Sequence, residues 1–357
     1  MKFLFIVQGE GRGHLTQAIS LREILLRNGH EVVAVLVGKN KRRELPDFFL
    51  KGISSPVIRF DSPNFLPSSR GKKPSLGKSV IFNFLKAPFY FRSTFFIRKQ
   101  IKKSKADVVI NFYELLAGVT YSIFSLKTPY VCIAHQYILL HPEFKFPKEN
   151  LIELYLLRFF TKKTCTNASK LLALSFREMK NSEDERIVVV PPLLRKEVFE
   201  IQPQDGDYLH GYMLDDTYAD EIIRYQSENP GVKIRFFWDR KNVSETEVVN
   251  ECLSFHKLND KLFLEYMANS LGYATTAGFE SVCEAMYFNK PILMVPTHIE
   301  QICNAFDASI SGAGIVSDDF DLSKLINYIP YHSPQEDFCQ WVRLAEKYIL
   351  KELETVS

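Results

Sequence analysis

The sequence predicts an α/β protein made of two consecutive domains, each built around a mainly parallel sheet. A chain of 357 residues is long enough for about two domains. Short apolar runs alternate along it with helical patterns, as in parallel sheets that helices cover on both faces. The charge also divides: residues 1–187 contain 31 Lys and Arg against 15 Asp and Glu, whereas residues 188–357 contain 14 against 27. A net charge of +16 is thus followed by one of −13, which suggests two domains with different partners.

The first half reads as strands separated by helices. Residues 3–7 form a continuous apolar run, as expected of a buried parallel strand, and a glycine loop at 9–14 precedes a helical pattern that ends near Gly29. Further apolar runs predict strands at residues 31–37, 56–60, 107–110 and 129–133. A segment rich in Pro, Ser, Gly and Lys, residues 62–78, is typical of a surface loop.

The second half repeats this pattern after a proline-rich junction. Residues 187–195 read as a strand that runs into a stiff linker, so we predict a first domain of residues 1–190, a second of 191–334 and a C-terminal segment of 335–357. The patterns predict strands at residues 207–213, 232–238, 273–276 and 291–295, and helices at 218–227, 258–270, 281–288, 301–309 and 336–353.

Composition and cysteine spacing exclude several other classes of protein. Hydrophobic residues make up 46% of the chain and charged residues 24%, which is typical of a packed globular protein and not of a disordered one. The first apolar run is shorter than the core of a signal peptide, and no run of ~18 apolar residues could span a bilayer. The 6 cysteines lack the spacing of a metal site, so we expect reduced thiols, no metal and a cytoplasmic protein.

The loop after the first strand contains Gly11 and Gly13 and is followed by His14. Small residues here let a ligand approach the backbone and the start of the helix. The sequence GEGRGH lacks the GxGxxG pattern and the later acidic residue of dinucleotide sites, and no P-loop sequence occurs. His14 stands at the carboxyl end of a strand, where a neutral imidazole could accept a proton from a hydroxyl. The alternative is a histidine that only hydrogen-bonds the loop.

The strongest cluster of candidate binding residues lies in the second half. A loop of small residues leads into a helix between Gly278 and Ser281, and such a helix start is a second candidate binding site for a phosphate. Glu284 follows about one turn later, where a carboxylate can accept hydrogen bonds from the two hydroxyls of a ribose. Glu300 and Gln301 stand at the start of the next helix, where their side chains can face the same ligand.

Taken in order, these motifs resemble those of GT-B glycosyltransferases. Residues 275–305 are similar to the carboxyl-terminal signature of that fold. The nearest well-known relative is glycosyltransferase family 28, which adds N-acetylglucosamine to a lipid-linked precursor of peptidoglycan, together with uncharacterised glycosyltransferases related to it. The loop with Gly11 and Gly13 resembles the glycine loop of that family. Three further segments resemble its remaining motifs and extend the resemblance over essentially the whole chain: residues 111–114, 133–136 and 191–195.

The resemblance implies a GT-B fold, in which two Rossmann-like domains face each other across a cleft. The first domain would bind the acceptor and the second a nucleotide-diphosphate sugar, in the first place a UDP-sugar. Residues 335–357 would cross back to the first domain. The activity implied is inverting transfer of the sugar to a hydroxyl acceptor, lipid-linked if the likeness to family 28 extends that far, without a metal or other cofactor.

The resemblance also implies the residues that hold the donor. Glu284 would bind the ribose, and the backbone around Gly278 and Ser281 would hold the diphosphate against the helix dipole. Arg195 would add positive charge beside the diphosphate. On this reading, loss of Glu284 weakens nucleotide binding with little effect on the stability of the fold.

Sugar hydroxyls and the catalytic base are assigned in the same way. Glu300 and Gln301 would hold hydroxyls of the donor sugar. His14 is the first candidate for the general base, followed by Glu114 and His135.

The chain departs from the family pattern at two points. Phe279 and Glu280 replace small residues of the donor loop, and the glutamate that the family has between its His and Gln is missing between His135 and Gln136. Since an acidic side chain beside a diphosphate is unfavourable, we expect either that Glu280 turns away from the donor or that the donor loop differs from that of the family.

Residues 78–105 are both basic and aromatic. They contain eight Lys and Arg, six Phe and a Tyr, but no Asp or Glu. Such a segment is typical of proteins that bind anionic membrane surfaces, so we expect this part of the chain to dock on the inner face of the cell membrane. Pro88 is expected to split the segment into two short helices. The alternatives are a helix with a solvated basic face and a nucleic-acid site, which the acidic second half disfavours.

Two other functions share the same donor site. A sugar-nucleotide epimerase of this fold would bind the same donor without needing an acceptor or a membrane. A non-catalytic protein that only binds sugar nucleotides would be consistent with the altered donor loop. Dependence on an acceptor separates a transferase from an epimerase, and turnover of the donor separates either enzyme from a binding protein.

Overall fold

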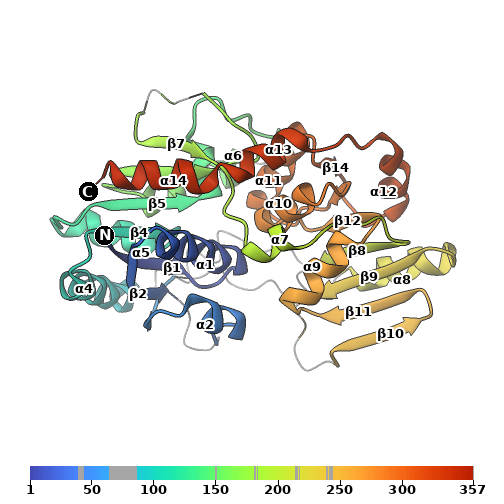
Figure 1. The fold of residues 1–357 in the computed structure, drawn as a ribbon, viewed down its shortest axis with the longest axis horizontal. Coiled ribbons are helices and arrows are strands. Elements are labelled where there is room, and N and C mark those ends of the chain that lie inside the picture. The colour runs from blue at the N-terminus through green and yellow to red at the C-terminus, as the bar shows by residue number, and fades with distance from the viewer. Residues whose placement is uncertain are drawn as a thin grey trace.

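The computed structural model describes residues 1–38, 44–63, 87–148, 151–180, 182, 184–213, 216, 218–238, 240 and 244–356. Within these residues the chain forms two parallel β-sheets with helices packed around them, one in each half (Figure 1). We call the first sheet and its helices the N-terminal lobe, and the second sheet and its helices the C-terminal lobe. Most of the loop predicted at 62–78, and residues 78–86 of the basic stretch, lie outside the described residues.

The first sheet has the strand order β3-β2-β1-β4-β5-β6-β7, and all its neighbouring strands are parallel. Both β4 and β5 are buried at every position, as their continuous apolar runs predict. Strand β6 was not predicted from the sequence. The bounds are β1 Lys2–Gln8, β2 Glu31–Gly38, β3 Val57–Phe60, β4 Val108–Phe112, β5 Tyr130–Ala134, β6 Lys170–Leu174 and β7 Ile187–Val190.

The second sheet has the order β10-β11-β9-β8-β12-β13-β14. Only β10, at the edge, runs antiparallel to its neighbour within the described part of this sheet. The sequence patterns did not predict β10, β11 or β14. Strand β10 is exposed at every position and β14 spans only three residues, so neither contains a long buried apolar run. The bounds are β8 Tyr208–Met213, β9 Lys233–Trp238, β10 Thr246–Asn250, β11 Leu253–Lys257, β12 Gly272–Thr275, β13 Ile292–Met294 and β14 Gly314–Val316.

Both sheets have a point at which the order of the strands reverses. In the first sheet the chain runs outward from β1 to β3 and then returns to place β4 beside β1. In the second sheet it runs outward from β8 and returns to place β12 beside β8. Open α/β sheets bind ligands at the carboxyl ends of the strands at such a point. The loop from β1 to α1 and the loop from β12 to α10 therefore lie where ligands are expected.

Helices connect the strands and cover the sheets (Figure 1). In the N-terminal lobe they are α1 Arg12–Arg27, α2 Asp47–Ile53, α4 Ala87–Ser104, α5 Leu115–Ile123, the 3-10 helix η1 His135–Leu140 and α6 Leu151–Thr164. The remaining ones are α7 Lys196–Glu200, α8 Ala219–Glu228, α9 Asp260–Ala268, α10 Phe279–Tyr287, α11 Ile299–Ile310, α12 Leu322–Tyr328, η2 Ile329–Tyr331, α13 Glu336–Arg343 and α14 Ala345–Glu354.

The C-terminal segment joins the two lobes. Helix α13 contacts α10 of the C-terminal lobe, whereas α14 contacts β7 of the N-terminal lobe (Figure 1). Trp341 of α13 already reaches the N-terminal lobe, where its Nε1 donates to the Ser175 carbonyl at 3.0 Å. The single helix predicted at 336–353 is wrong, because the chain changes direction at Leu344, where it passes from one lobe to the other.

Helix α4 has 18 residues and begins at Ala87, so Pro88 lies in its first turn. A proline is tolerated there because the first backbone N–H groups of a helix have no partner within the helix. The part of the basic stretch before Ala87, residues 78–86, lies outside the described residues, so the expected division into two helices stays a prediction.

Helices α5 and α6 approach each other closely at Gly118. A Cβ atom added to Gly118 would lie 2.0 Å from the Lys163 carbonyl oxygen and 2.7 Å from the Thr164 carbonyl carbon. Both of these neighbours are backbone atoms, which cannot move aside independently. The packing of α5 on α6 thus depends on a residue without a side chain.

We predict that Gly118→Ala destabilises the protein by about 1–3 kcal/mol, since the two helices must move apart to admit a methyl group. Urea unfolding followed by circular dichroism measures the change. Gly231→Ala is the matched control, because a Cβ there meets no atom within 4 Å. Equal stability of the two variants would mean that α5 and α6 separate at no cost.

Candidate functional site

The two loops at the reversal points face each other across the contact between the lobes. Gly11 is the N-cap of α1 and Gly278 the N-cap of α10, and neither helix start has a side-chain cap. Between the loops the approach is close, because a Cβ at Gly13 would lie 3.1 Å from Cγ of Glu280. Gly13 therefore allows α10 to come near the backbone of the first loop.

His14 lies at the centre of this contact and is buried. Its ring stacks on Tyr113, with 5.6 Å between the ring centroids. Its Nδ1 is 3.3 Å from Oε1 of Gln17, and its Nε2 is 3.5 Å from Nε2 of Gln136. The sequence predicts a functional role for His14 but none for Gln17 or for the side chain of Tyr113.

The partners of Gln17 fix the tautomer of His14. Nε2 of Gln17 donates to Oε1 of Glu280 at 2.5 Å, so the amide oxygen of Gln17 faces His14. An amide oxygen only accepts, which means that Nδ1 of His14 carries the proton and Nε2 has an unprotonated lone pair that faces the amide nitrogen of Gln136. The Nε2 atom is therefore the one that can act as a base.

A second glutamine links His14 to the C-terminal lobe. Nε2 of Gln136 donates to Oε1 of Glu300 at 2.9 Å. Burial lowers the pKa of His14, and the carboxylate of Glu300 and the hydrogen bond that His14 donates to Gln17 act in the opposite direction. A proton taken up by His14 would thus be stabilised by a negative charge one glutamine away.

His135 lies beside this network and makes different contacts. Its Nδ1 donates to the Leu174 carbonyl at 2.7 Å, and its ring stacks on Phe279 of α10 at a centroid distance of 3.9 Å. Its Nε2 is buried without a hydrogen-bond partner. Burial lowers the pKa of His135, and the Asp307 carboxylate partly offsets this. The aromatic residue that departs from the family pattern thus packs against a histidine of the other lobe.

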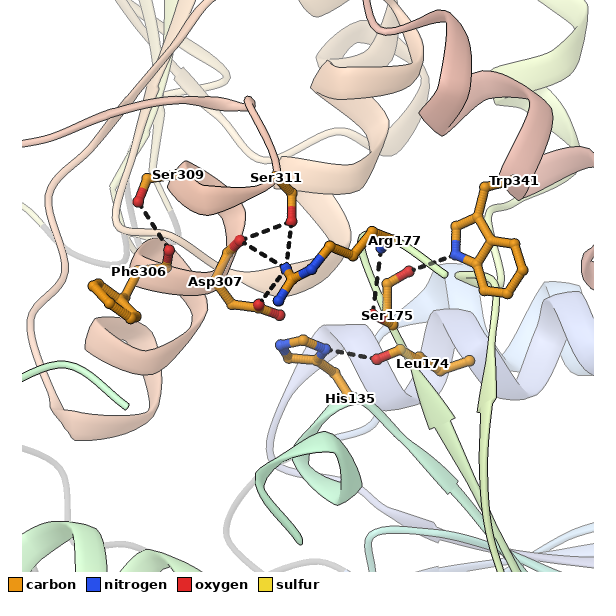
Figure 2. A network of polar contacts seen from close by, with 9 residues as sticks. All are labelled: His135, Leu174, Ser175, Arg177, Phe306, Asp307, Ser309, Ser311 and Trp341. Atoms are coloured by element: carbon orange, nitrogen blue, oxygen red, sulfur yellow. Dashed lines mark hydrogen bonds and ion pairs between the residues drawn. The ribbon is translucent and has the colours of Figure 1, made fainter. Parts of the chain in front are cut away.

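An ion pair between the lobes lies next to His135. Nη1 of Arg177 donates to Oδ1 of Asp307 at 2.6 Å and to the Ser311 hydroxyl at 2.7 Å. Figure 2 shows Arg177 reaching from the N-terminal lobe toward Asp307 and Ser311, with the His135 ring below the Asp307 carboxylate. Asp307 is almost fully buried, so this pair ties the lobes together away from solvent.

The carboxylate of Glu284, the expected ribose ligand, is hydrogen-bonded to Arg195 in the structure. Arg195 donates to it from Nε at 2.6 Å and from Nη2 at 3.1 Å. Asp260 lies 3.7 Å from Arg195 and accepts a 2.6 Å hydrogen bond from Arg12 of the first loop. Burial lowers the pKa of Arg195, but the neighbouring carboxylates raise it overall. The chain Arg12, Asp260, Arg195 and Glu284 therefore connects the two loops by alternating charges.

This pairing corrects the expectation that Glu284 contributes little to stability. Its side chain is 2% exposed and both of its oxygens accept from Arg195. Removing either partner would leave the other as a buried charge without its counterion, which is strongly destabilising.

Ser281 and Gln301 make local contacts at the starts of their helices. The Ser281 hydroxyl donates to the Gly278 carbonyl at 3.2 Å. Oε1 of Gln301 accepts from the backbone N–H of Thr297 at 2.9 Å and from its hydroxyl at 2.7 Å. The oxygen of Gln301 thus holds the loop before α11, and only its amide nitrogen is left to face a ligand.

Glu114 lies apart from these contacts. It caps α5, since its Oε1 accepts from the Leu116 N–H at 3.0 Å and from the Ser62 hydroxyl at 2.5 Å. It also packs against Gly38, where a Cβ would lie 2.1 Å from Oε2. Burial raises the pKa of Glu114 to about 7. No described hydrogen bond joins Glu114 to His14, so its visible role is that of a helix cap.

The arrangement is suited to moving a proton beside an anion site. Nε2 of His14 is a base, and the uncapped start of α10 presents N–H groups that attract negative charge. Among the described residues, no group of three or more His, Cys, Asp or Glu side chains is placed to hold a metal ion. None of the described helices is both long and apolar enough to cross a membrane.

This fold and the matching family model define a glycosyltransferase of the GT-B type. The chain belongs to the family described as glycosyl transferase family 1, whose model matches residues 1–331. No curated protein matches the sequence.

Several solved structures share the fold at low sequence identity. The glycotransferase of kitacinnamycin is 12% identical with a TM-score of 0.69, and the match covers 99% of this chain and 98% of that one. A spinosyn rhamnosyltransferase complexed with thymidine diphosphate is 12% identical, with a TM-score of 0.62 and coverages of 99% and 100%. An Arabidopsis thaliana protein complexed with UDP-L-rhamnose is 15% identical, with a TM-score of 0.62 and coverages of 99% and 97%. None of these matches singles out family 28, so that finer likeness stays a prediction.

We predict that Arg195→Met lowers the free energy of unfolding by about 3 kcal/mol, because it leaves Glu284 buried without its partner. The double variant Arg195→Met/Glu284→Gln should recover part of this loss. Urea unfolding measures both. Arg186→Met is the control, since its ion pair with Asp184 is exposed and should contribute at most about 1 kcal/mol. Similar losses for Arg195→Met and Arg186→Met would contradict a buried role for the pair.

Proposed function

We propose that this protein transfers a sugar from a nucleoside-diphosphate donor, in the first place a UDP-sugar, to a hydroxyl group of an acceptor. The observation that carries the proposal is the position of His14, which Gln17 links to Glu280 at the start of α10 and Gln136 links to Glu300 at the start of α11, across the contact between the lobes. A base and an anion site side by side are what glycosyl transfer requires. The neighbouring structures with UDP-L-rhamnose and thymidine diphosphate support this class of donor.

The donor would bind to the C-terminal lobe. The start of α10, at Gly278 and Ser281, would hold the diphosphate, and Glu284 would accept hydrogen bonds from the ribose. Arg195 would then exchange Glu284 for the phosphates, so that Arg195 keeps an anionic partner and Glu284 keeps hydrogen-bond donors. Gly11 and Gly13 would close over the diphosphate from the other side.

The chemical step would be a direct displacement. The acceptor hydroxyl would give its proton to Nε2 of His14 as its oxygen attacks the anomeric carbon of the sugar. The bond from that carbon to the diphosphate oxygen would break on the opposite face, which inverts the anomeric centre. Glu300, linked through Gln136, would stabilise the imidazolium, and the helix dipole of α10 would stabilise the departing diphosphate without a metal.

Entry of the donor would require the lobes to move apart. The contacts of Gln17 with Glu280 and of His135 with Phe279 are buried between the two loops. Both must loosen before a nucleotide sugar can reach the start of α10. Hydrogen bonds to glutamine amides are weak enough to be broken and remade in each cycle.

We further propose that the acceptor is lipid-linked and that the N-terminal lobe docks on an anionic membrane. Helix α5 contacts both α4 and α6, so these two helices flank it on one side of the first sheet. Each carries exposed apolar side chains and ends in two lysines, which suits an anionic bilayer surface. The exposed apolar residues are Phe89, Phe91 and Phe95 on α4 and Leu151, Ile152, Tyr155 and Phe159 on α6.

We predict that His14→Ala lowers the rate of transfer by roughly 10²–10⁴-fold while UDP binding stays nearly unchanged. The rate is measured as release of the nucleoside diphosphate from UDP-, GDP- and dTDP-sugars with and without acceptor alcohols, and binding by calorimetry. His332→Ala, in the C-terminal lobe away from the site, is the control. A His14→Ala variant with normal turnover would remove the proposed base, and failure of every nucleotide sugar to bind would overturn the proposed function.

We predict that replacing Arg98, Lys99, Lys102 and Lys103 by Gln weakens sedimentation with anionic vesicles, because each basic residue near an anionic surface contributes about 1 kcal/mol. Vesicles of neutral lipid should bind the native protein poorly, and added salt should release it from anionic ones. The matched control replaces four lysines of the C-terminal lobe, Lys233, Lys257, Lys261 and Lys324. Equal loss in both variants, or equal binding to neutral and anionic vesicles, would favour a soluble acceptor.

A further inference from the structure

Glu280 is an acid in the first turn of α10, where the proposed diphosphate would bind. A carboxylate at this place would repel the donor. The sequence therefore predicts that Glu280 turns away from the donor or that the donor loop differs. In the structure the Glu280 side chain extends toward the first loop, with its Cγ beside Gly13.

The two oxygens of Glu280 have different surroundings. Oε1 accepts a 2.5 Å hydrogen bond from Nε2 of Gln17. Oε2 is shielded from solvent and has no hydrogen-bond partner. A buried carboxylate oxygen without a donor is costly, whereas a carboxylic acid O–H in the same position lacks only an acceptor.

The neighbouring charges and the burial favour the acid form. Burial raises the pKa of Glu280 to about 8, the hydrogen bond from Gln17 lowers it, Glu284 raises it and Arg195 lowers it again. The other titratable neighbours are Cys283, on the same helix, and His14, which contacts Gln17. At neutral pH the O–H group is thus present on Oε2.

The hydroxyl groups near the start of α10 are close to one another. Tyr273 and Thr275 of β12 are fully buried, and the Ser281 and Thr275 hydroxyls are close enough to the Tyr273 hydroxyl to hydrogen-bond it and lower its pKa. The Ser281 hydroxyl also donates to the Gly278 carbonyl. Oε2 of Glu280, which has no partner among the described residues, lies beside an uncapped helix start that attracts an oxyanion.

We propose that Glu280 binds the donor diphosphate as a neutral acid, donating a hydrogen bond from its Oε2 hydroxyl to a phosphate oxygen. This inference rests on the proposed function and adds a ligand to its donor site. It gives the departure from the family pattern a physical role, because an acid that holds its proton can replace a neutral donor.

The inference fixes the sign of a pH effect. Below the pKa of Glu280 the O–H group is available and the donor binds. Above it, Glu280 becomes a carboxylate that offers no hydrogen and repels the diphosphate. With a pKa of about 8, affinity at pH 9 should be roughly tenfold lower than at pH 7, since about one protein in ten keeps the proton.

The test is calorimetry of UDP binding to the full-length protein at pH 7 and pH 9. The native protein should lose affinity roughly tenfold between the two values. In Glu280→Gln the amide donates at every pH, so UDP should bind with the same affinity at both. Titration of UDP itself, and of every other group in the protein, affects both proteins equally and cancels in the comparison. Glu280→Ala should bind UDP more weakly at pH 7 and show no tenfold step.

The outcomes separate this inference from the proposed function. The same pH dependence in the native protein and in Glu280→Gln would overturn the role of Glu280 while leaving the donor site in place. Normal affinity of Glu280→Ala at pH 7 would do the same. Absence of binding to UDP, GDP and dTDP at either pH would overturn the donor site itself and this inference with it. Thermal unfolding of each variant at both pH values verifies that the compared proteins are folded.

Discussion

Two glutamine side chains link the N-terminal lobe to the C-terminal lobe on either side of His14. Gln17 and Gln136 both come from the N-terminal lobe, each lies beside His14, and each donates to a carboxyl group of the C-terminal lobe. Gln17 determines the tautomer of His14. Gln136 lies between His14 and the carboxylate of Glu300. Neutral amides are well suited to this task, because they orient a base without adding a charge of their own and can be replaced by ligand hydroxyls when the lobes separate.

Much of the fold could be predicted from the sequence because its strands are buried on both faces. The strands around His14 and Gly278 are runs of apolar residues bounded by glycines, and such runs leave little choice but a parallel sheet. The predictions failed where burial no longer controls the pattern. The edge strand β10 is exposed throughout, β14 is very short, and the C-terminal helix is broken at Leu344 because its two parts pack on different lobes. Amphipathic periodicity reports a buried face but not which lobe buries it.

The site was predictable residue by residue but not as a set of contacts. The sequence was enough to name His14, which follows the first strand, and Glu284, on the helix after β12, as candidates. Their partners come from distant segments: Gln17 meets Glu280, and Arg195 meets Glu284. Glu114 shows that a candidate named from its position can have another role. A carboxylate after a strand can cap the next helix, as Glu114 caps α5. Only Gln17 had a local signal, as it lies one helical turn after His14.

The route of the chain between the lobes constrains how they can move. The backbone crosses from one lobe to the other between β7 and β8, and crosses back at Leu344 between α13 and α14. Because two chain segments connect the lobes, each connection acts as a hinge. The lobes can rotate about the line through both hinges, but they can neither twist about a single connection nor separate. The second hinge lies beyond residue 331, outside the part of the chain that matches the family model. Loss of the last two helices would therefore leave both loops intact and still let them close in the wrong register.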